Sequence, residues 1–146
     1  MIRPIEARDV DAILAIQSTC LEIAQWTAWD YGRVARGEMI GWVAHADDRA
    51  AITGFLVARR IAEDIEILNL AVQPGARRRG IGSELLRESF AWGKSVGAAS
   101  ALLEVRQTNF AALHFYARHG FEVVARRKQY YIAPIEDALV LKAKLQ

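Results

Sequence analysis

The chain has 146 residues, of which 53% are hydrophobic and 25% charged, and its formal net charge at pH 7 is only +2. This composition excludes a disordered chain, a collagen-like repeat and a disulfide-dense mini-protein, and the small net charge does not indicate nucleic-acid binding. Apolar runs are too short to span a bilayer, no signal peptide is recognisable, and the single cysteine, Cys20, allows no internal disulfide. We therefore expect one cytoplasmic domain over residues 1–146, without a membrane segment.

Two helices are predicted to follow a short strand at residues 2–5. Asp9 precedes apolar residues at mostly helical spacing that reach Leu21, so we expect the first helix to start after Asp9. Thr27 and Asp30 match a capping box, in which each side chain bonds the backbone of the other residue at a helix start. A second, short helix is therefore expected from Thr27.

Strand patterns follow in the middle of the chain. Residues 40–44 alternate as in a strand, Asp47-Asp48-Arg49 is typical of a turn, and residues 52–60 supply the return strand of a hairpin. A further strand, rich in Ile, Leu and Val, covers residues 65–72, and Pro74-Gly75 is expected to end it.

The second half of the chain alternates helices and strands. A long helix is expected from Ile81, a short buried strand over residues 102–105, a helix over 109–119, a strand over 121–131 and a last strand around 139–141. Three glycines are placed to end helices: Gly37, Gly97 and Gly120. The order of elements predicts an α/β (α+β) fold, with a mixed, mostly antiparallel sheet flanked by about four helices.

A basic loop between the strand that ends at Val72 and the long helix has the composition of an anion site. Its residues are Val72-Gln73-Pro74-Gly75-Ala76-Arg77-Arg78-Arg79-Gly80-Ile81-Gly82-Ser83. A helix N-terminus presents unpaired N–H groups, glycines let the backbone approach a ligand, and arginines attract phosphate. No Gly-Lys-Ser/Thr makes a P-loop, and Leu85 stands where a dinucleotide fingerprint needs its third glycine. A lone Gly-x-Gly is more often a solvated basic turn.

Two spaced motifs in the second half resemble those of the GNAT superfamily of acyl-CoA-dependent N-acyltransferases. Arg77-x-x-Gly80-x-Gly82 matches the Gln/Arg-x-x-Gly-x-Gly/Ala loop that binds the coenzyme A pyrophosphate in that family. Leu103-Glu104-Val105-Arg106-x-x-Asn109-x-x-Ala112-x-x-Phe115-Tyr116-x-x-x-Gly120-Phe121 matches the second part of the pattern. The resemblance extends from about Ile65 to the C-terminus. It implies the GNAT fold, acetyl-CoA as the co-substrate, and no metal.

Within that superfamily the chain resembles the RimI-type protein N-terminal acetyltransferases, which acetylate the N-terminal alanine of a ribosomal protein. The resemblance lies in Asn69-Leu70-Ala71-Val72, in Leu103-Glu104-Val105-Arg106, and in Arg127-Lys128-Gln129-Tyr130-Tyr131 followed by Glu136-Asp137-Ala138. It implies a protein N-terminus, such as that of a ribosomal protein, as the acceptor. The segment from Thr19 to Trp29 follows the family loosely and the one between Tyr131 and Glu136 is short, which leaves the acceptor's identity open.

The resemblance also implies which residues contact the co-substrate. The backbone of residues 70–72 would bind the amides of pantetheine like an added strand, at the point where this strand splays from its neighbour in the family. An N–H near Val72 would polarise the thioester carbonyl. Asn109 is a predicted helix N-cap and, by resemblance, a polar contact to the arm. The full set is Leu70, Ala71, Val72, Arg77, Arg78, Arg79, Gly80, Ile81, Gly82, Ser83, Asn109 and Tyr116.

Glu104 and Tyr116 are the candidate catalytic residues. Acetyl transfer needs a base that deprotonates the amine and an acid that protonates the departing thiolate. Glu104 stands in an apolar strand, where a carboxylate is unexpected, although a solvent-facing position or a salt bridge to Arg106 would also explain it. Tyr116 would equally suit core packing on its helix. The resemblance favours the roles of base for Glu104 and acid for Tyr116.

Three aromatic residues are candidates for the acceptor groove: Tyr130, Tyr131 and Trp26. Packing explains each of them as well, on a strand for the tyrosines and beside the short second helix for Trp26. The three histidines have no spacing that suggests a zinc site.

Other functions remain open from the sequence. A GNAT enzyme could act on a small-molecule amine or on a lysine side chain, and a non-catalytic acyl-CoA sensor or a basic phosphate-binding module would carry the same loop. No direct nucleic-acid contact is expected, because the basic residues centre on one loop without a recognition motif.

Overall fold

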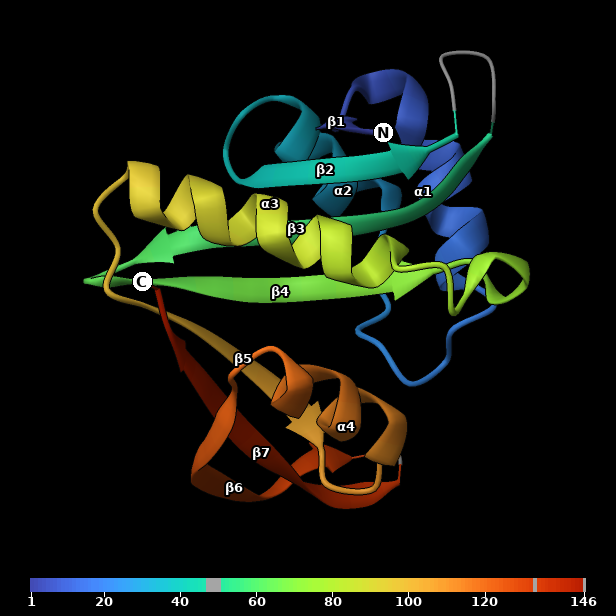
Figure 1. Ribbon diagram of the computed structural model, residues 1–146. Coiled ribbons are helices and arrows are strands. Elements are labelled where there is room, and N and C mark those ends of the chain that lie inside the picture. The colour runs from blue at the N-terminus through green and yellow to red at the C-terminus, as the bar shows by residue number, and fades with distance from the viewer. Residues whose placement is uncertain (47–50, 133, 146) are drawn as a thin grey trace. The chain divides into compact units, whose positions relative to one another are not determined.

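The computed structural model describes residues 1–46, 51–132 and 134–145. Its strands and helices follow one another in the predicted order (Figure 1). They are β1 (Ile2–Pro4), α1 (Val10–Gln17), α2 (Ala28–Ala35), β2 (Ile40–His45), β3 (Ile52–Ile61), β4 (Asp64–Val72), α3 (Ile81–Ser95), β5 (Ser100–Arg106), α4 (Phe110–Arg118), β6 (Glu122–Ile132) and β7 (Ile135–Lys144). The turn expected at Asp47-Asp48-Arg49 lies outside the described residues.

The predicted mixed sheet is confirmed, with seven strands in the order β1-β2-β3-β4-β5-β7-β6. β4 pairs in parallel with β5, whereas β1 with β2, β2 with β3, β5 with β7 and β6 with β7 are antiparallel. The chain divides into two compact units, residues 1–59 with 67–92 and residues 60–66 with 93–146. β4 contributes to both units, because the division falls after Glu66.

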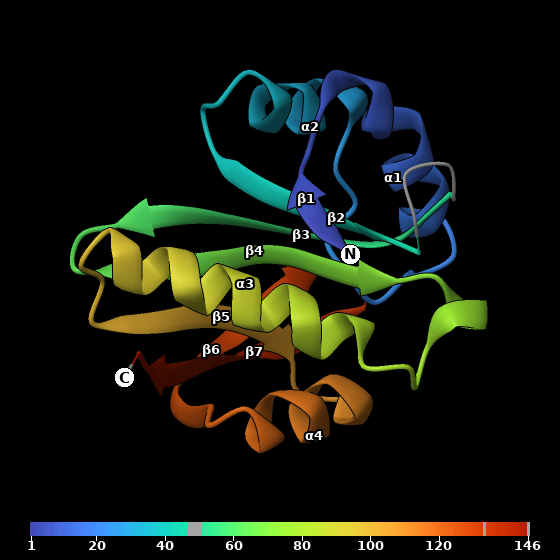
Figure 2. The ribbon, with the colours of Figure 1, turned by 45° about the horizontal axis from the view of Figure 1, so that its top comes forward.

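The first unit has helices on both faces of its strands (Figure 2). On one face Phe55 of β3 belongs to a buried core with Ile13 of α1 and Tyr31 of α2. The preceding residue, Gly54, faces the other way, as strand alternation requires. A Cβ added at Gly54 would lie 3.3 Å from a methyl group of Leu85, so α3 packs closely against that second face.

The second unit places the candidate base on the more open face of its strands. Along β5, Leu103 and Val105 are buried, whereas Leu102, Glu104 and Arg106 are only partly buried. This alternation is the two-residue period of a strand with one side in the core. Glu104 therefore points to a face that a ligand can reach.

The capping box at the start of α2 and the three helix-ending glycines are confirmed. At the start of α2, Thr27 Oγ1 accepts a hydrogen bond from the Asp30 N–H at 3.3 Å, and the Asp30 carboxylate accepts one from the Thr27 N–H at 2.9 Å. Gly37, Gly97 and Gly120 lie just past α2, α3 and α4, each with positive φ. Among the described residues no helix is long and apolar enough to cross a membrane.

The first helix is shorter than the apolar spacing predicts. α1 ends at Gln17, and Leu21 lies beyond it with 78% of its surface exposed. The segment after α1 is held by tertiary hydrogen bonds instead of helical ones, since Gln17 Nε2 donates to the Trp26 carbonyl at 2.8 Å. Asp9 precedes α1 as expected, but its carboxylate accepts bonds from Arg3 and from the Glu6 N–H rather than capping the helix.

Candidate functional site

The loop at the start of α3 has the backbone form of an anion site. The Gly80 carbonyl accepts the N–H of Glu84 at 3.0 Å, so the amides of Ile81 and Gly82 precede the helical hydrogen-bond ladder. Gly80 has φ +78°, and a Cβ built there would meet no atom within 4 Å. Arg78 also has a positive φ, +64°, which is unusual for a residue with a side chain. The loop can therefore present backbone N–H groups to an anion from an open surface.

The three arginines of this loop have different roles. Arg78 and Arg79 are exposed, as a phosphate-binding role requires. Arg77 is instead engaged within the first unit: its Nε donates to the Val72 carbonyl at 3.3 Å, and its Nη2 lies 3.2 Å from Cys20 Sγ and 3.8 Å from a Glu22 carboxylate oxygen. Arg77 thus braces the loop against the end of β4 and against the segment after α1.

A buried polar network supports the segment of β4 that is predicted to contact pantetheine. Asn69, which is 5% exposed, donates from Nδ2 to the Ala24 carbonyl and to the Tyr31 hydroxyl, both at 3.0 Å. The Tyr31 hydroxyl in turn donates to Gln17 Oε1. In the sequence Asn69 is only part of a motif, although a polar residue between leucines is a signal for such a network.

The predicted contact residues at the end of β4 are Leu70, Ala71 and Val72. Ala71 is buried, and the other two are partly buried. The register between β4 and β5 consists of two pairs, Ile65 with Ala101 and Glu66 with Leu102. On its β3 side the chain stays bonded past the strand end, because the Gln73 N–H donates to the Thr53 carbonyl at 2.7 Å.

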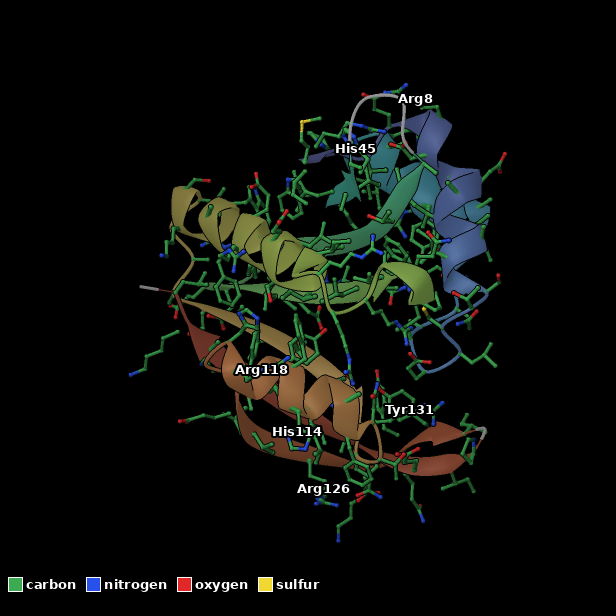
Figure 3. The ribbon with its side chains drawn as sticks, turned by 45° about the vertical axis from the view of Figure 1, so that its right-hand side comes forward. Arg8, His45, His114, Arg118, Arg126 and Tyr131 are labelled. Carbon is green, nitrogen blue, oxygen red and sulfur yellow. The ribbon has the colours of Figure 1, made fainter. Side chains whose placement is uncertain are left out.

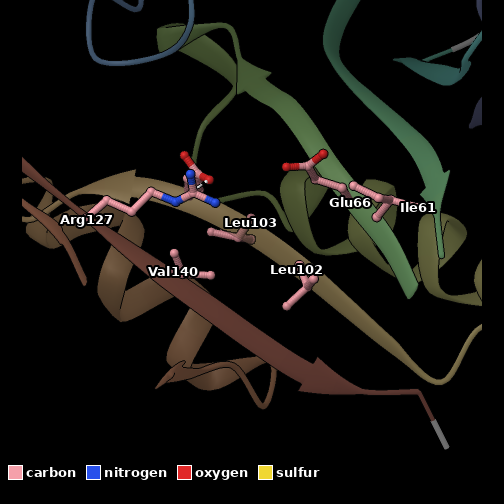
Figure 4. A pocket seen from close by; sticks show the side chains of 7 residues that line it. Ile61, Glu66, Leu102, Leu103, Arg127 and Val140 are labelled. Atoms are coloured by element: carbon pink, nitrogen blue, oxygen red, sulfur yellow. Dashed lines mark ion pairs between the residues drawn. The ribbon is translucent and has the colours of Figure 1, made fainter. Parts of the chain in front are cut away.

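Glu104 lines a small pocket of about 110 Å³ in the second unit (Figure 4). The pocket is otherwise lined by a second carboxylate, one arginine and apolar side chains: Glu66, Arg127, Ile61, Leu102, Leu103 and Val140. Figure 4 shows Glu66 and Arg127 reaching into it from opposite sides. The side chain of Glu104 is 19% exposed, so its carboxylate is sheltered yet reachable.

Two side chains of β6 contact the Glu104 carboxylate. Arg127 Nε lies 3.1 Å from Glu104 Oε1, and the Tyr130 hydroxyl donates a hydrogen bond to the same carboxylate. The negative charge of Glu104 and this hydrogen bond raise the pKa of Tyr130 above its ordinary value. Tyr130 thus contacts the carboxylate that lines the pocket, and Arg127 is a site residue that the sequence showed only as part of a motif.

Arg106 was one possible salt-bridge partner of Glu104 in the sequence. In the structure it pairs with Glu136 at 3.3 Å, and its guanidinium lies 4.0 Å from the centre of the Tyr131 ring. The Glu136 carboxylate also accepts the Thr108 N–H at 2.8 Å, and the hydrogen bonds from Thr108 and Arg106 lower the pKa of Glu136. Arg106 therefore links Glu136 to the Tyr131 ring.

Helix α4 carries the candidate acid. Asn109 caps the helix as predicted, since its Oδ1 accepts the Ala112 N–H at 3.2 Å. Tyr116 is 9% exposed and packs edge-to-face between Phe115 and Phe121, with ring centres 5.2 and 5.3 Å away. Burial raises the pKa of Tyr116, so its hydroxyl keeps its proton at neutral pH. Core packing and a proton-donating role are both compatible with this position.

Trp26, the remaining candidate for the acceptor groove, and the histidines lie on different helices, strands and loops. Trp26 packs in the first unit, its ring centre 5.4 Å from that of Tyr31, in agreement with the packing interpretation. His45 lies on β2 and His114 on α4, and Figure 3 also shows Arg126 and Tyr131 on β6. Within the described part of the chain, no three His, Cys, Asp or Glu side chains are grouped so that they could hold a metal ion.

Comparison with known proteins relates most of the chain to one family. The model of the acetyltransferase (GNAT) family matches residues 10–121. A ribosomal protein bS18-alanine N-acetyltransferase of Salmonella typhimurium is 34% identical over 98 residues, which are 66% of this chain and 65% of that protein. The matched stretch thus spans slightly less than two thirds of that relative's length.

Solved structures of other acetyltransferases share the fold. The ribosomal-protein-S18-alanine N-acetyltransferase of Escherichia coli superimposes with a TM-score of 0.86 at 23% identity, covering 100% of this chain and 94% of that one. NAA60 of Arabidopsis thaliana, in complex with acetyl-CoA, gives a TM-score of 0.85 at 20% identity, covering 99% and 98%. Since the family model covers well over half of the chain, the protein belongs to the acetyltransferase (GNAT) family.

Proposed function

We propose that this protein is an acetyl-CoA-dependent N-acetyltransferase that acts on the N-terminal α-amine of a protein. The observation that carries the proposal is the Glu104 pocket: a sheltered carboxylate between apolar side chains, contacted by a tyrosine hydroxyl and one exposed arginine. An amine that attacks a thioester must lose a proton, and a carboxylate in such a pocket is suited to accept it. Membership of the GNAT family supports the same reaction class.

The residues of the α3 loop fit the pyrophosphate of coenzyme A. Acetyl-CoA supplies the activated acyl group as a thioester. The amides of Ile81 and Gly82 and the exposed side chains of Arg78 and Arg79 would bind the phosphates, because helix N-termini and guanidinium groups both attract such anions. Gly80 contributes an open surface, since no atom lies within 4 Å of the position of a Cβ. Ser83, Asn109 and the backbone of residues 70–72 complete the proposed contacts.

Two proton transfers are assigned to side chains of the second unit. Glu104 takes the proton of the attacking amine, and Tyr116 gives its proton to the departing thiolate. Tyr116 is suited to be the acid because burial raises its pKa, which keeps the hydroxyl protonated at the pH of the reaction.

The acceptor that we propose is a protein with an N-terminal alanine, a ribosomal protein in the cytoplasm among them. The Salmonella typhimurium relative is named for this substrate class, and the matched region includes most of the present chain. Tyr130 and Tyr131 are the proposed acceptor contacts, supported by the hydrogen bond of Tyr130 to Glu104 and by the Arg106 guanidinium over the Tyr131 ring.

A peptide panel tests the acceptor class. Coenzyme A release and peptide mass are measured with an Ala-initiated peptide, the same peptide with a blocked N-terminus and an internal lysine, and a small polyamine. We expect a 42-dalton gain, the mass of an acetyl group, only on the free N-terminus. Acetylation of the blocked peptide or of the polyamine would contradict the N-terminal assignment, and coenzyme A release from none of them would support a non-catalytic sensor.

A further inference from the structure

Arg77 joins the α3 loop to the segment between α1 and α2. Its Nε donates to the Val72 carbonyl at 3.3 Å, at the end of β4, and its Nη2 lies 3.2 Å from Cys20 Sγ. The Cys20 thiol also lies 3.9 Å from the Val72 carbonyl, so the three groups meet at one point. One side chain of the loop therefore links the end of β4 to residues 18–27, which form neither helix nor strand.

The contacts that Arg77 makes with this segment differ in strength and burial. Its ion pair with Glu22, at 3.8 Å, joins two side chains that are 48% and 46% exposed, so water screens both charges and the pair contributes little. Cys20, by contrast, is only 1% exposed. The contact between Nη2 and its sulfur can therefore persist only while the segment stays packed, and opening of the segment breaks it.

The segment that contains Cys20 is hydrogen-bonded as one unit up to Trp26. The Cys20 carbonyl accepts the N–H of Ile23 at 3.3 Å and Nε2 of Gln25 at 3.2 Å, so the chain folds back on Cys20. Gln17 fixes Trp26 in turn, because its side-chain amide donates to the Trp26 carbonyl at 2.8 Å and accepts the Trp26 N–H at 3.0 Å. Trp26, a candidate acceptor residue, thus belongs to the same unit as the cysteine that Arg77 contacts.

The engaged guanidinium separates Arg77 from the two arginines that follow it. Arg78 and Arg79 are exposed, and the phosphate contacts proposed above are assigned to them. A guanidinium donates in fixed directions, and two of the three Arg77 nitrogens already contact Val72 and Cys20. Arg77 therefore holds the backbone of the loop in place instead of meeting the phosphate.

We propose that Arg77 is a positioning residue that couples the α3 loop to the segment between α1 and α2, so that coenzyme A bound at the loop stabilises the packed position of Cys20. The inference rests on the proposed function, because it requires coenzyme A at this loop. An anion held by the first amides of α3 restrains the loop backbone, and a restrained loop keeps Arg77 in contact with Cys20. The coupling is reciprocal, so a packed segment also favours the occupied loop.

The single cysteine of the chain makes this coupling measurable without turnover. Because Cys20 is buried, iodoacetamide reaches it only when the segment opens, and the alkylation rate reports the open fraction. The rate is measured by mass spectrometry without ligand and with saturating desulfo-coenzyme A, which has no thiol to consume the reagent. We expect the saturating ligand to slow alkylation of the wild-type protein by about five-fold or more.

Arg77→Gln is the decisive variant. The amide nitrogen of a glutamine occupies the same place along the side chain as Arg77 Nε, so the bond to Val72 can persist while the contact with Cys20 is lost. We expect this variant to be alkylated faster than the wild type, and the saturating ligand to slow it by less than about two-fold. Arg77→Met, which removes both donors, should lose the protection in the same way, and thermal unfolding shows that each variant is folded.

Arg79→Gln is the matched control, since it removes the same charge from an exposed position of the same loop. It should weaken desulfo-coenzyme A binding in calorimetry and still show wild-type protection once the ligand is saturating. Wild-type protection in saturated Arg77→Gln would overturn the coupling, because the ligand would then cover Cys20 directly or Arg77 would be a structural brace alone. An unprotected wild-type protein that binds the ligand would also overturn it, and in both cases the proposed function stands. Absence of binding to the wild-type protein would remove both proposals.

Discussion

The α3 loop and the Glu104 pocket are built in opposite ways. The loop is local: its glycines, arginines and first-turn amides are consecutive residues, and its shape follows from a strand end, a turn and a helix start. The pocket draws on residues 61 to 140 of the chain, and it depends on a bulge in β6 for two of its contacts. A local motif can be recognised from spacing, whereas a pocket of this kind exists only after strands have paired.

The largest expected effect on activity comes from Tyr116, the proposed acid in the second unit, which also holds the Glu104 pocket. Tyr116→Phe keeps the ring and its packing against Phe115 and Phe121 but removes the hydroxyl. We expect kcat to fall by roughly 10²–10⁴-fold, with the melting temperature and the affinity for acetyl-CoA nearly unchanged. Steady-state kinetics and thermal unfolding measure this together. An unchanged kcat would return Tyr116 to a packing role.

Replacing the proposed base, Glu104, should cause a smaller loss of activity, and the size of that loss should depend on pH. Glu104→Gln keeps the shape of the side chain but accepts no proton, so activity at pH 7 should fall by roughly 10²-fold. The deficit should shrink as the pH rises past about 8, where an α-amine loses its proton unaided, but not for a lysine acceptor with its pKa near 10.4. The pH profile of kcat/KM with both acceptors is the measurement. A wild-type profile would make Glu104 a structural carboxylate.

A change in the α3 loop is expected to affect only the binding of acetyl-CoA. Gly82→Val places a branched side chain at the first turn of α3 and should weaken acetyl-CoA binding by at least about ten-fold, or 1.4 kcal/mol. Gly75→Ala is the control in the same loop, since its Cβ would meet no atom within 4 Å and its φ is not left-handed. Calorimetry of acetyl-CoA binding should separate the two. Equal affinities in folded proteins would count against a pyrophosphate site.

The smallest effect, a small loss of stability, should come from replacing Asp137, which supports the bulge in β6. Asp137→Asn removes the charge that accepts from Gln129 and Arg126, so the melting temperature should fall slightly at neutral pH. The pKa of Asp137 is lowered in the folded state from its ordinary 3.8, so its charge stabilises the fold above that pH. The contribution is lost as the pH falls through the lowered pKa. Chemical unfolding at pH 7 and pH 2.5 should show the difference from wild type only at pH 7.

Much of the fold was predictable because its signals are local. Apolar periods, the Thr27–Asp30 capping box and the helix-ending glycines act within a few residues, and the structure confirms the order of elements that they predict. The prediction that helical structure extends toward Leu21 was wrong because a tertiary bond from Gln17 to Trp26 competes with the helix there. Such bonds join residues whose proximity no local pattern encodes.

The candidate site also has features that follow from local sequence and features that depend on tertiary contacts. The sequence by itself determined the anion loop, the helix cap at Asn109 and the presence of a carboxylate in β5, because each is a matter of residue type and short spacing. Only the tertiary structure decided that Arg77 braces β4 and that Arg127 and Tyr130 contact Glu104. The physical reason is that side-chain direction in a strand depends on register, and a bulge supported by a carboxylate on the neighbouring strand changes that register for every residue beyond it.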